Sequence, residues 1–141
     1  MSKPCAFCAI VAGDADASIV WHDDDLVGFL DIRPLFHGHV LVVPTVHVAT
    51  YDQLPPDLVS HLAATTQTVQ RAVESACGAD GSMLLVNNVV SQSVPHLHQH
   101  VIPRRKGDGL RLWLGPRHPY TDDAERESTA QRIRDALGDL P

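Results

Sequence analysis

Three histidines at alternate positions, His96, His98 and His100, are the residues of this chain whose type and spacing most clearly suggest chemistry. They lie in the stretch SVPHLHQHVIPR, from Ser93 to Arg104. On a helix, side chains two positions apart point roughly 200° apart and cannot cluster. On a strand, alternate side chains share one face about 6.6 Å apart. We therefore predict a strand that carries three imidazoles on one side.

This imidazole face has three chemical interpretations. A solvated edge needs no function, but three strictly alternating imidazoles after the polar stretch SQS are not typical of such an edge. A metal site is the second interpretation, because neutral imidazole is a common zinc ligand. The third is nucleophilic catalysis, because a neutral imidazole nitrogen attacks phosphorus without a separate base. The triad residues alone leave the last two open.

The elements that would position these histidines follow from periodicity and from turn residues. The long helix has prolines at its start and Gly78 just past its end, the usual asymmetry of helix termini. Five strands with one long helix between the third and fourth predict an α+β fold with an antiparallel sheet. In chain order, we predict two strands within 18–32, a strand over 38–44, a helix over 55–78, strands over 81–88 and 96–103, and a helix over 121–138.

Length, charge and cysteine content limit the functions open to the chain. Its 141 residues suit one domain. A net charge of −6 argues against broad binding of nucleic acid or anionic membranes, which needs an excess of Lys and Arg. No apolar run approaches the roughly 20 residues of a membrane span, and the start is a poor signal peptide. An odd count of cysteines (Cys5, Cys8 and Cys77) favours a reduced, cytoplasmic setting.

The stretch SVPHLHQHVIPR resembles the histidine triad motif, His-φ-His-φ-His-φ-φ, of the HIT superfamily. The resemblance extends upstream through CAFCAIVAGD, LVGFLDIRPLFHGHVLVVPTVH and the polar segment NN…SQSV, and so covers about residues 4–106. It implies that 1–141 is a single HIT domain, with 107–141 as a C-terminal extension and helix. It also implies a homodimer whose sheets join into one, and hydrolysis or transfer at the α-phosphate of a nucleotide.

The resemblance assigns the reacting groups residue by residue. His98 matches the nucleophile that takes up the nucleotidyl group. His100 matches the histidine that contacts phosphate oxygens and assists the leaving group. Ser93 and Gln92 match the segment that hydrogen-bonds the phosphate, and Asn87 matches an asparagine of the same pocket. Such donors suit a transition state that spreads negative charge over phosphoryl oxygens.

The resemblance also assigns the residues around the nucleoside. Asp31 matches the carboxylate that accepts hydrogen bonds from the ribose hydroxyls, with Phe29 and Ile32 near the base. A carboxylate suits a diol and would repel phosphate, which agrees with that role. His39 matches a histidine that borders the site. The alternative for Asp31 is a turn aspartate at a strand end, and Asn87 could likewise be a turn former.

Cys5 and Cys8 are spaced as zinc ligands are, although two cysteines alone are weak evidence. In zinc-bearing relatives, the positions that match His47 and His96 complete a Cys₂His₂ site. Four protein ligands close the coordination sphere, so this zinc would be structural and His98 would stay free to attack. Two small buried thiols are the alternative interpretation.

The expected substrates are purine nucleoside phosphoramidates, with AMP or GMP as product and no catalytic metal. One alternative is hydrolysis of dinucleoside polyphosphates, whose phosphate tail would bring magnesium. A second is a nucleotide-binding regulatory protein with little turnover. A third is a metalloenzyme with an open zinc at the three histidines. Residues 107–120 are expected to help form the leaving-group pocket.

Two positions depart from the family pattern. Gln99 stands where the family usually has an apolar residue, so a buried Gln99 would need hydrogen-bond partners, at a cost of roughly 1–3 kcal/mol without them. Ser91 stands where phosphoramidate hydrolases often have glycine. Close approach of the backbone to phosphate is therefore less certain at that point.

Overall fold

The computed structural model describes residues 4–111 and 115–141. It divides into two compact units, residues 1–108 and 109–141, which are described separately. The first unit carries the sheet, two α-helices and all the site residues predicted above. The second carries one helix. Residues 112–114, which belong to the predicted leaving-group segment 107–120, lie outside the described residues.

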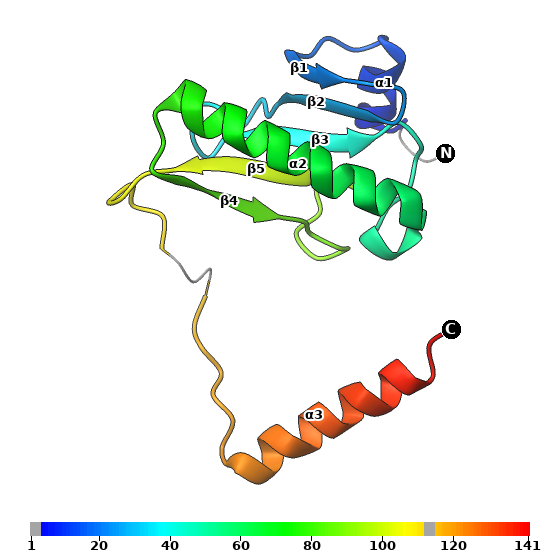
Figure 1. The fold of residues 1–141 in the computed structure, drawn as a ribbon, viewed down its shortest axis with the longest axis vertical. Coiled ribbons are helices and arrows are strands. Elements are labelled where there is room, and N and C mark those ends of the chain that lie inside the picture. Colours follow the sequence, from blue (N-terminus) through cyan, green and yellow to red (C-terminus); the bar gives the residue numbers. More distant parts are fainter. Residues whose placement is uncertain (1–3, 112–114) are drawn as a thin grey trace. The chain divides into compact units, whose positions relative to one another are not determined.

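A five-stranded antiparallel sheet forms the first unit, which confirms the predicted α+β class (Figure 1). Spatial order is β1-β2-β3-β5-β4, so the triad segment leads into a strand in the interior of the sheet. The first two strands both lie within the predicted range 18–32 and are joined by the short acidic turn Asp23-Asp24-Asp25. The strands are β1 (Ile19–His22), β2 (Leu26–Leu30), β3 (Val40–Pro44), β4 (Gly81–Leu85) and β5 (Gln99–Arg104).

Helix α2 (Pro56–Cys77) lies across one face of the sheet, where it packs on β5, β3 and β4 (Figure 1). It ends at Gly78, whose φ of 56° is the left-handed conformation that glycine adopts at little cost. Its buried stripe packs on alternate residues of the strands, which form the larger part of the core. That part includes Leu26, Val40, Val42, Leu62, Val69, Val73, Leu97 and Val101.

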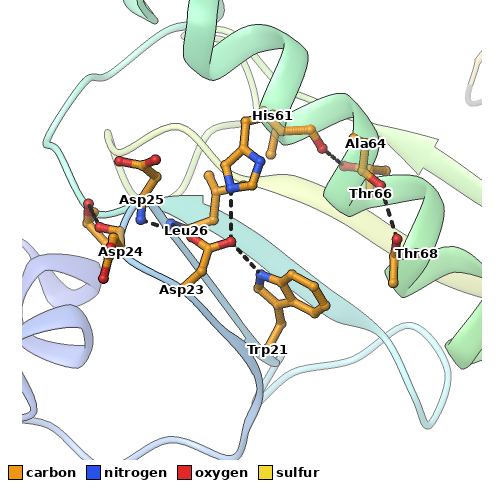
Figure 2. Close-up of polar contacts among 11 residues, drawn as sticks. Trp21, Asp23, Asp24, Asp25, Leu26, His61, Ala64, Thr66 and Thr68 are labelled. Carbon is orange, nitrogen blue, oxygen red and sulfur yellow. Dashed lines mark hydrogen bonds and ion pairs between the residues drawn. The ribbon is translucent and has the colours of Figure 1, made fainter.

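A carboxylate fixes α2 to the turn between β1 and β2 (Figure 2). One oxygen of Asp23 accepts from the backbone N–H groups of Asp25 and Leu26, at 2.9 and 2.8 Å. The other accepts from Nε1 of Trp21 at 3.1 Å and from Nε2 of His61 on α2 at 2.9 Å. Burial raises the pKa of Asp23, but these four donors outweigh it and lower that pKa to about 2.

Helix α1 (Ala6–Ala12) covers the opposite face of the sheet, and the sequence analysis did not predict it. Its Phe7 packs on Val27 and Phe29 of β2 and on Leu41 and Val43 of β3. These strand residues alternate with those that face α2, so α1 and α2 lie on different faces. Seven residues are too few to show helical periodicity, which is why the helix was missed.

The triad segment enters β5 later than predicted. The strand begins at Gln99, so His96 and His98 precede the ladder and only His100 lies within it. The side chains upstream of the strand nevertheless continue to alternate in direction. The N–H of Leu97 donates to the carbonyl of Val48 at 2.7 Å, which holds this segment in place. The departure at Gln99 is satisfied locally, since its Nε2 donates to the carbonyls of Leu85 and His100 at 3.2 and 3.1 Å.

The second unit contains α3 (Asp123–Gly138), which agrees with the predicted helix over 121–138. Asp122 caps its N-terminus by accepting from the N–H of Glu125 at 2.7 Å. Its apolar side chains Ile133 and Leu137 are exposed. Among the described residues, no helix is long and apolar enough to cross a lipid bilayer.

Candidate active site and metal centre

A cavity of about 550 Å³ opens between α1, β2 and the triad segment. Its size falls in the range of small-molecule sites. One end holds imidazoles and a hydroxyl, and the rest of the wall is mostly apolar. The predicted site residues that line it are Phe29, Asp31, Ile32, Ser93, His98 and His100.

The protonation of His98 is fixed by a main-chain carbonyl. Its Nδ1 lies 2.7 Å from the carbonyl oxygen of His96, an atom that only accepts hydrogen bonds. Nδ1 of the neutral ring therefore carries the hydrogen, and Nε2 carries the lone pair. The ring is 4% exposed, and the edge-to-face contact with Phe7, at 5.1 Å between centroids, holds its plane. In its neutral form, His98 thus offers an unprotonated ring nitrogen to a cavity with a mostly apolar lining.

A chain of hydrogen bonds likewise fixes His100. The N–H of Leu35 donates to Nδ1 of His39 at 3.2 Å, so Nε2 of His39 carries that ring's hydrogen. This Nε2 donates to Nδ1 of His100 at 2.9 Å. The hydrogen of His100 is then on its Nε2, a buried atom without a hydrogen-bond partner among the described residues. A buried, unpaired N–H beside the His98 ring is a ready donor for an anionic oxygen.

The pKa values of both rings of this pair are lowered. Burial lowers the pKa of His39 most, the nearby His98 lowers it further, and Asp31 opposes the change. Burial likewise lowers the pKa of His100, with His98 and His39 adding to the effect, to about 4. His100 therefore acts as a neutral hydrogen-bond donor at pH 7.

Asp31 lines the cavity beside the histidine pair. Its Oδ1 accepts from the backbone N–H of Arg33 at 2.8 Å, which is the turn role considered as an alternative. Its Oδ2 lies 3.8 Å from Nε2 of His39. One carboxylate thus holds the local turn and also faces the cavity, so the turn role does not displace the binding role.

Asp31, His39 and His100 are near enough together to hold a metal ion, with donor atoms within 4.8 Å of one another. Their hydrogen bonds argue against this. A metal would need the Nε2 lone pair of His39, but the bond from Leu35 makes that atom an N–H. His39 and His100 are better described as a hydrogen-bonded pair that orients His100, with the Asp31 carboxylate 3.8 Å from Nε2 of His39.

Asn87 and Gln92 are placed in the loop before the triad, outside the set of residues that lines the cavity. The amide of Gln92 donates to the carbonyl of Ala49 at 2.6 Å and accepts from the N–H of Val89 at 3.3 Å. Nδ2 of Asn87 donates to the carbonyl of Ser91 at 3.4 Å. The two amides therefore shape the loop that leads to Ser93, and their contact with phosphate stays a prediction.

The same loop holds two residues in the left-handed region of backbone conformation. Val89 has a φ of 67° and Ser91 a φ of 61°. A β-branched residue at positive φ is an outlier, and such strain costs about 1–3 kcal/mol. Ser91 occupies the position where phosphoramidate hydrolases often have glycine, so the backbone conformation that glycine favours is kept without it.

The four predicted zinc ligands come together at the other side of the triad segment. They are Cys5, Cys8, His47 and His96. Nδ1 of His47 lies 3.2 Å from Sγ of Cys8, and Nδ1 of His96 lies 3.4 and 3.5 Å from Sγ of Cys5 and Cys8. Ideal tetrahedral zinc with Zn–S of about 2.3 Å and Zn–N of about 2.05 Å would place N and S about 3.6 Å apart. The donor set therefore fits zinc in type, number and spacing.

The protonation of His96 agrees with a ligand role. Its Nε2 donates to the carbonyl of Pro44 at 2.8 Å, so Nδ1 presents its lone pair to the thiols. Burial raises the pKa of the Cys8 thiol, and the adjacent Cys5 raises it further. A bound dication would offset both effects by stabilising the thiolates. His96 is thereby turned away from the cavity, so the triad histidines do not converge on one open metal.

The model of the HIT domain matches residues 12–107, which is more than half of the sequence. This chain belongs to the histidine triad family. It is 37% identical over 136 residues to an uncharacterised HIT-like protein of Mycobacterium tuberculosis, covering 95% of this chain and 93% of that one. It is 33% identical over 146 residues to an adenylylsulfatase of Arabidopsis thaliana, covering 100% of this chain and 73% of that one.

Among solved structures, this HIT protein is similar to a Zn-bound histidine triad family protein of Mycobacterium smegmatis. The two are 37% identical with a TM-score of 0.72, over 94% of this chain and 96% of that one. The neighbour's zinc is consistent with the Cys₂His₂ cluster described above. The family is therefore settled, while activity and metal content of this HIT protein are matters for proposal.

Sequence reasoning missed part of the cavity wall. Phe7 and Ile10 of α1, and Asp16 in the segment after it, line the cavity but were not predicted as site residues. Phe7 lies between Cys5 and Cys8, and Ile10 lies two residues after Cys8. The two predicted thiol ligands and this part of the cavity wall therefore belong to one short helix and its N-cap. The Cys spacing was the available signal that this segment folds against the triad.

Proposed function

We propose that this HIT protein is a nucleotidyl hydrolase or transferase that acts at the α-phosphate through a nucleotidyl-His98 intermediate. The observation that carries the proposal is the 2.7 Å hydrogen bond from Nδ1 of His98 to the carbonyl of His96, which leaves the Nε2 lone pair as a nucleophile. Family membership supports it, and the adenylylsulfatase relative is named for a reaction at an adenylyl phosphate.

In the first step, Nε2 of His98 attacks the α-phosphorus and the bond from phosphorus to the leaving group breaks. The N–H of His100 Nε2 donates to a phosphoryl oxygen, where negative charge grows in the transition state. The Ser93 hydroxyl, which also lines the cavity, supplies a second donor. The leaving nitrogen takes a proton from solvent as its bond to phosphorus breaks, so it departs as a neutral amine. The ring of His98 is then bonded to phosphorus through Nε2 and keeps its hydrogen on Nδ1, and so carries a positive charge.

In the second step, water attacks phosphorus and releases a proton to solvent. The bond to Nε2 breaks, its electron pair returns to the ring of His98, and a nucleoside monophosphate leaves. Asp31 holds the ribose hydroxyls through its free carboxylate lone pairs. Phe29 and Ile32 contact the base, and His39 orients His100 through the 2.9 Å bond between their rings. Because phosphoryl transfer needs positioning and charge stabilisation more than covalent help from further groups, this set is sufficient without a catalytic metal.

Purine nucleoside phosphoramidates are the proposed substrates, with AMP or GMP as product. Their amine leaving group adds no negative charge beyond the α-phosphate, which suits a cavity whose lining includes the carboxylates of Asp16 and Asp31. The second candidate is hydrolysis of dinucleoside polyphosphates, and the cation of Arg33 on the cavity lining is the observation that favours it. Magnesium would accompany that substrate.

Structural zinc at Cys5, Cys8, His47 and His96 is part of the proposal. When bound, it would supply four metal–ligand bonds that tie α1 and the segment after β3 to the triad. Three free cysteines suit a reducing cytoplasm, where we place the protein.

We also propose a homodimer joined through β4. This strand is an edge of the sheet and exposes Leu84 at 43%. The opposite edge, β1, carries an irregularity between Ile19 and Trp21, and such bulges discourage pairing with another strand. Two copies joined at β4 would form one continuous sheet.

The test is steady-state turnover of adenosine 5′-phosphoramidate and of a diadenosine polyphosphate by wild type and His98→Ala. We expect wild type to cleave the phosphoramidate faster, and the variant to lose at least about 1,000-fold in kcat. His22→Ala, at an exposed position on β1, is the matched control and should keep full turnover.

The outcomes separate the candidates. Faster cleavage of the polyphosphate would move this protein to the second candidate. Wild-type turnover by His98→Ala would overturn the mechanism. AMP binding without cleavage of either substrate would favour a regulatory nucleotide-binding role.

A further inference from the structure

The cavity wall carries a second carboxylate that the proposed mechanism does not use. Asp16 lines the cavity in the segment between α1 and β1, flanked by Ala15 and Ala17, which line it too. No donor from the described residues contacts the Asp16 side chain, in contrast to Asp31, which accepts from the backbone N–H of Arg33. Asp16 is therefore free to accept hydrogen bonds from a ligand.

The backbone that carries Asp16 is held in place at both ends. Gly13 ends α1 in the left-handed conformation, and the N–H groups of Asp14 and Ala15 both donate to the carbonyl of Ala9, at 2.8 and 3.2 Å. After Asp16, the carbonyl of Ser18 accepts from the N–H of Leu30 at 3.0 Å. A fixed main chain keeps the exposed carboxylate of Asp16 at the cavity wall, where it can meet the edge of a ligand.

The surroundings of Asp16 are those of a base rather than of a phosphate. Ile10, Ala17 and Phe29 belong to the apolar cluster around Phe7, and Ile10, Ala17, Phe29 and Phe7 line the cavity. Apolar walls suit the two faces of a planar ring. A phosphate at this end would meet an unpaired negative charge, whereas ring N–H groups would meet an acceptor.

A carboxylate distinguishes the bases by their donors. Guanine presents two parallel donors, N1–H and the 2-amino group, which match the two oxygens of a carboxylate. Adenine presents one amino group beside the N1 lone pair, which a carboxylate repels. We propose that Asp16 selects guanine, so that guanosine 5′-phosphoramidates are the preferred substrates. This inference rests on the proposed function only in placing the nucleoside in this cavity.

The test compares binding of GMP and AMP, by titration calorimetry, and kcat/KM for guanosine and adenosine 5′-phosphoramidates. We expect wild type to favour guanine by about tenfold, which corresponds to about 1.4 kcal/mol. Asp16→Asn replaces one acceptor oxygen by an NH₂ donor, the pattern that matches adenine. It should therefore reverse the preference, and IMP, which lacks the 2-amino group, should bind wild type between GMP and AMP.

Asp14→Asn is the matched control, because it makes the same change of charge on the same segment at a residue that does not line the cavity. Its ratio of guanine to adenine should equal that of wild type. Equal or stronger binding of AMP by wild type would overturn the inference, and so would an unchanged ratio in Asp16→Asn. Preferential GMP binding that Asp16→Asn removes, with no cleavage of either phosphoramidate, would support the inference while the catalytic proposal fails.

Discussion

His96 and His98 stand two residues apart, both nearly fully buried, and have opposite chemistry. Each ring donates one N–H to a main-chain carbonyl, but through different nitrogens. His96 donates through Nε2 to Pro44 at 2.8 Å, and His98 donates through Nδ1 to His96 at 2.7 Å. His96 is left with an Nδ1 lone pair beside two thiols, and His98 with an Nε2 lone pair inside the cavity.

The comparison shows that the residue type alone does not decide between ligand and nucleophile. A neutral imidazole has one lone pair, and the carbonyl that takes its N–H determines where that lone pair points. The same rule extends to the third triad member, because the bond from His39 makes the outward nitrogen of His100 a donor. One short segment thus directs one lone pair toward two thiols, a second lone pair into the cavity and one N–H donor beside it, as the proposed ligand, nucleophile and donor require.

We expect the largest effect from a variant that removes one of the four proposed zinc ligands. Cys8→Ser removes one ligand and leaves Cys5, His47 and His96 without a closed site. We expect zinc content to fall well below one ion per chain and Tm to fall by more than about 10 °C, or about 3–5 kcal/mol for a chain of this size. Metal analysis and thermal unfolding of the same sample measure both.

Cys77→Ser is the control for this change. Cys77 lies outside the cluster and its Sγ contacts the carbonyl of His37 at 3.6 Å, a bond that a serine hydroxyl also makes. We expect full zinc content and nearly unchanged Tm. A Cys8→Ser protein with wild-type zinc and Tm would refute the closed four-ligand site.

The second effect concerns the donor side. His100→Ala removes the buried N–H beside His98 and should lower kcat by about 100- to 1,000-fold, as loss of an oxyanion donor does. His39→Ala should cost about tenfold, because it removes only the group that orients His100. His39→Gln should recover much of that loss, since the amide N–H of glutamine can replace Nε2–H.

Steady-state kinetics at pH 7 with zinc content measured in parallel would test this ranking. Both His39 variants should keep their zinc, because His39 contacts none of the four ligands in the described structure. Equal losses in His39→Ala and His39→Gln would show that His39 acts by packing and not by donating a hydrogen.

Much of the fold followed from sequence, because periodicity survives in this chain where elements are long. The 22-residue α2 and the strands on either side of the acidic turn were predicted within a few residues. α1 was missed because seven residues, about two helical turns, are too few to show a period. The start of β5 was placed too early, since alternation of side chains continues through His96 and His98 although the ladder does not.

It was possible to predict from sequence which residues form the site, but not which ring nitrogen of each histidine carries the hydrogen. The family pattern placed Cys5, Cys8, His47 and His96 together, and the structure brings them together. The tautomers were not predictable, because the acceptor for His96 is the carbonyl of Pro44, 52 residues away in sequence. Asp16 was not predicted either, since a lone aspartate in a short connection has no pattern that marks it as part of a cavity.

The third effect is the loss of folding stability when His100 is protonated in acid. His100 has a pKa of about 4 in the folded chain, against an ordinary value near 6.5, so the unfolded chain binds the proton more readily. Stability is therefore complete above about pH 6.5 and falls as pH decreases toward 4. At pH 5 the expected loss from this group is about 2 kcal/mol relative to neutral pH.

Urea unfolding of wild type and His100→Gln between pH 7 and pH 4.5 would measure this. The groups that face His100 are His98, His39 and Asp31. Burial lowers the pKa of His39 as well, so His39 adds to the wild-type slope in the same direction. The difference between the two proteins isolates His100. We expect the variant to lose less stability in acid, and parallel curves would show that this ring is not held neutral.

The smallest effect should come from a histidine outside both clusters, His61, which donates from α2 to Asp23 (Figure 2). His61→Ala removes one of four donors to that carboxylate, at a position where the His61 side chain is 39% exposed. We expect a loss of about 0.5–1 kcal/mol in urea unfolding at pH 7, because partly exposed ion pairs contribute little. His61→Gln, which can still donate, should lose less. Zinc content and turnover should stay at wild-type values in both variants. A change in either would show that His61, which lies outside both clusters around the triad, also affects the zinc site or catalysis.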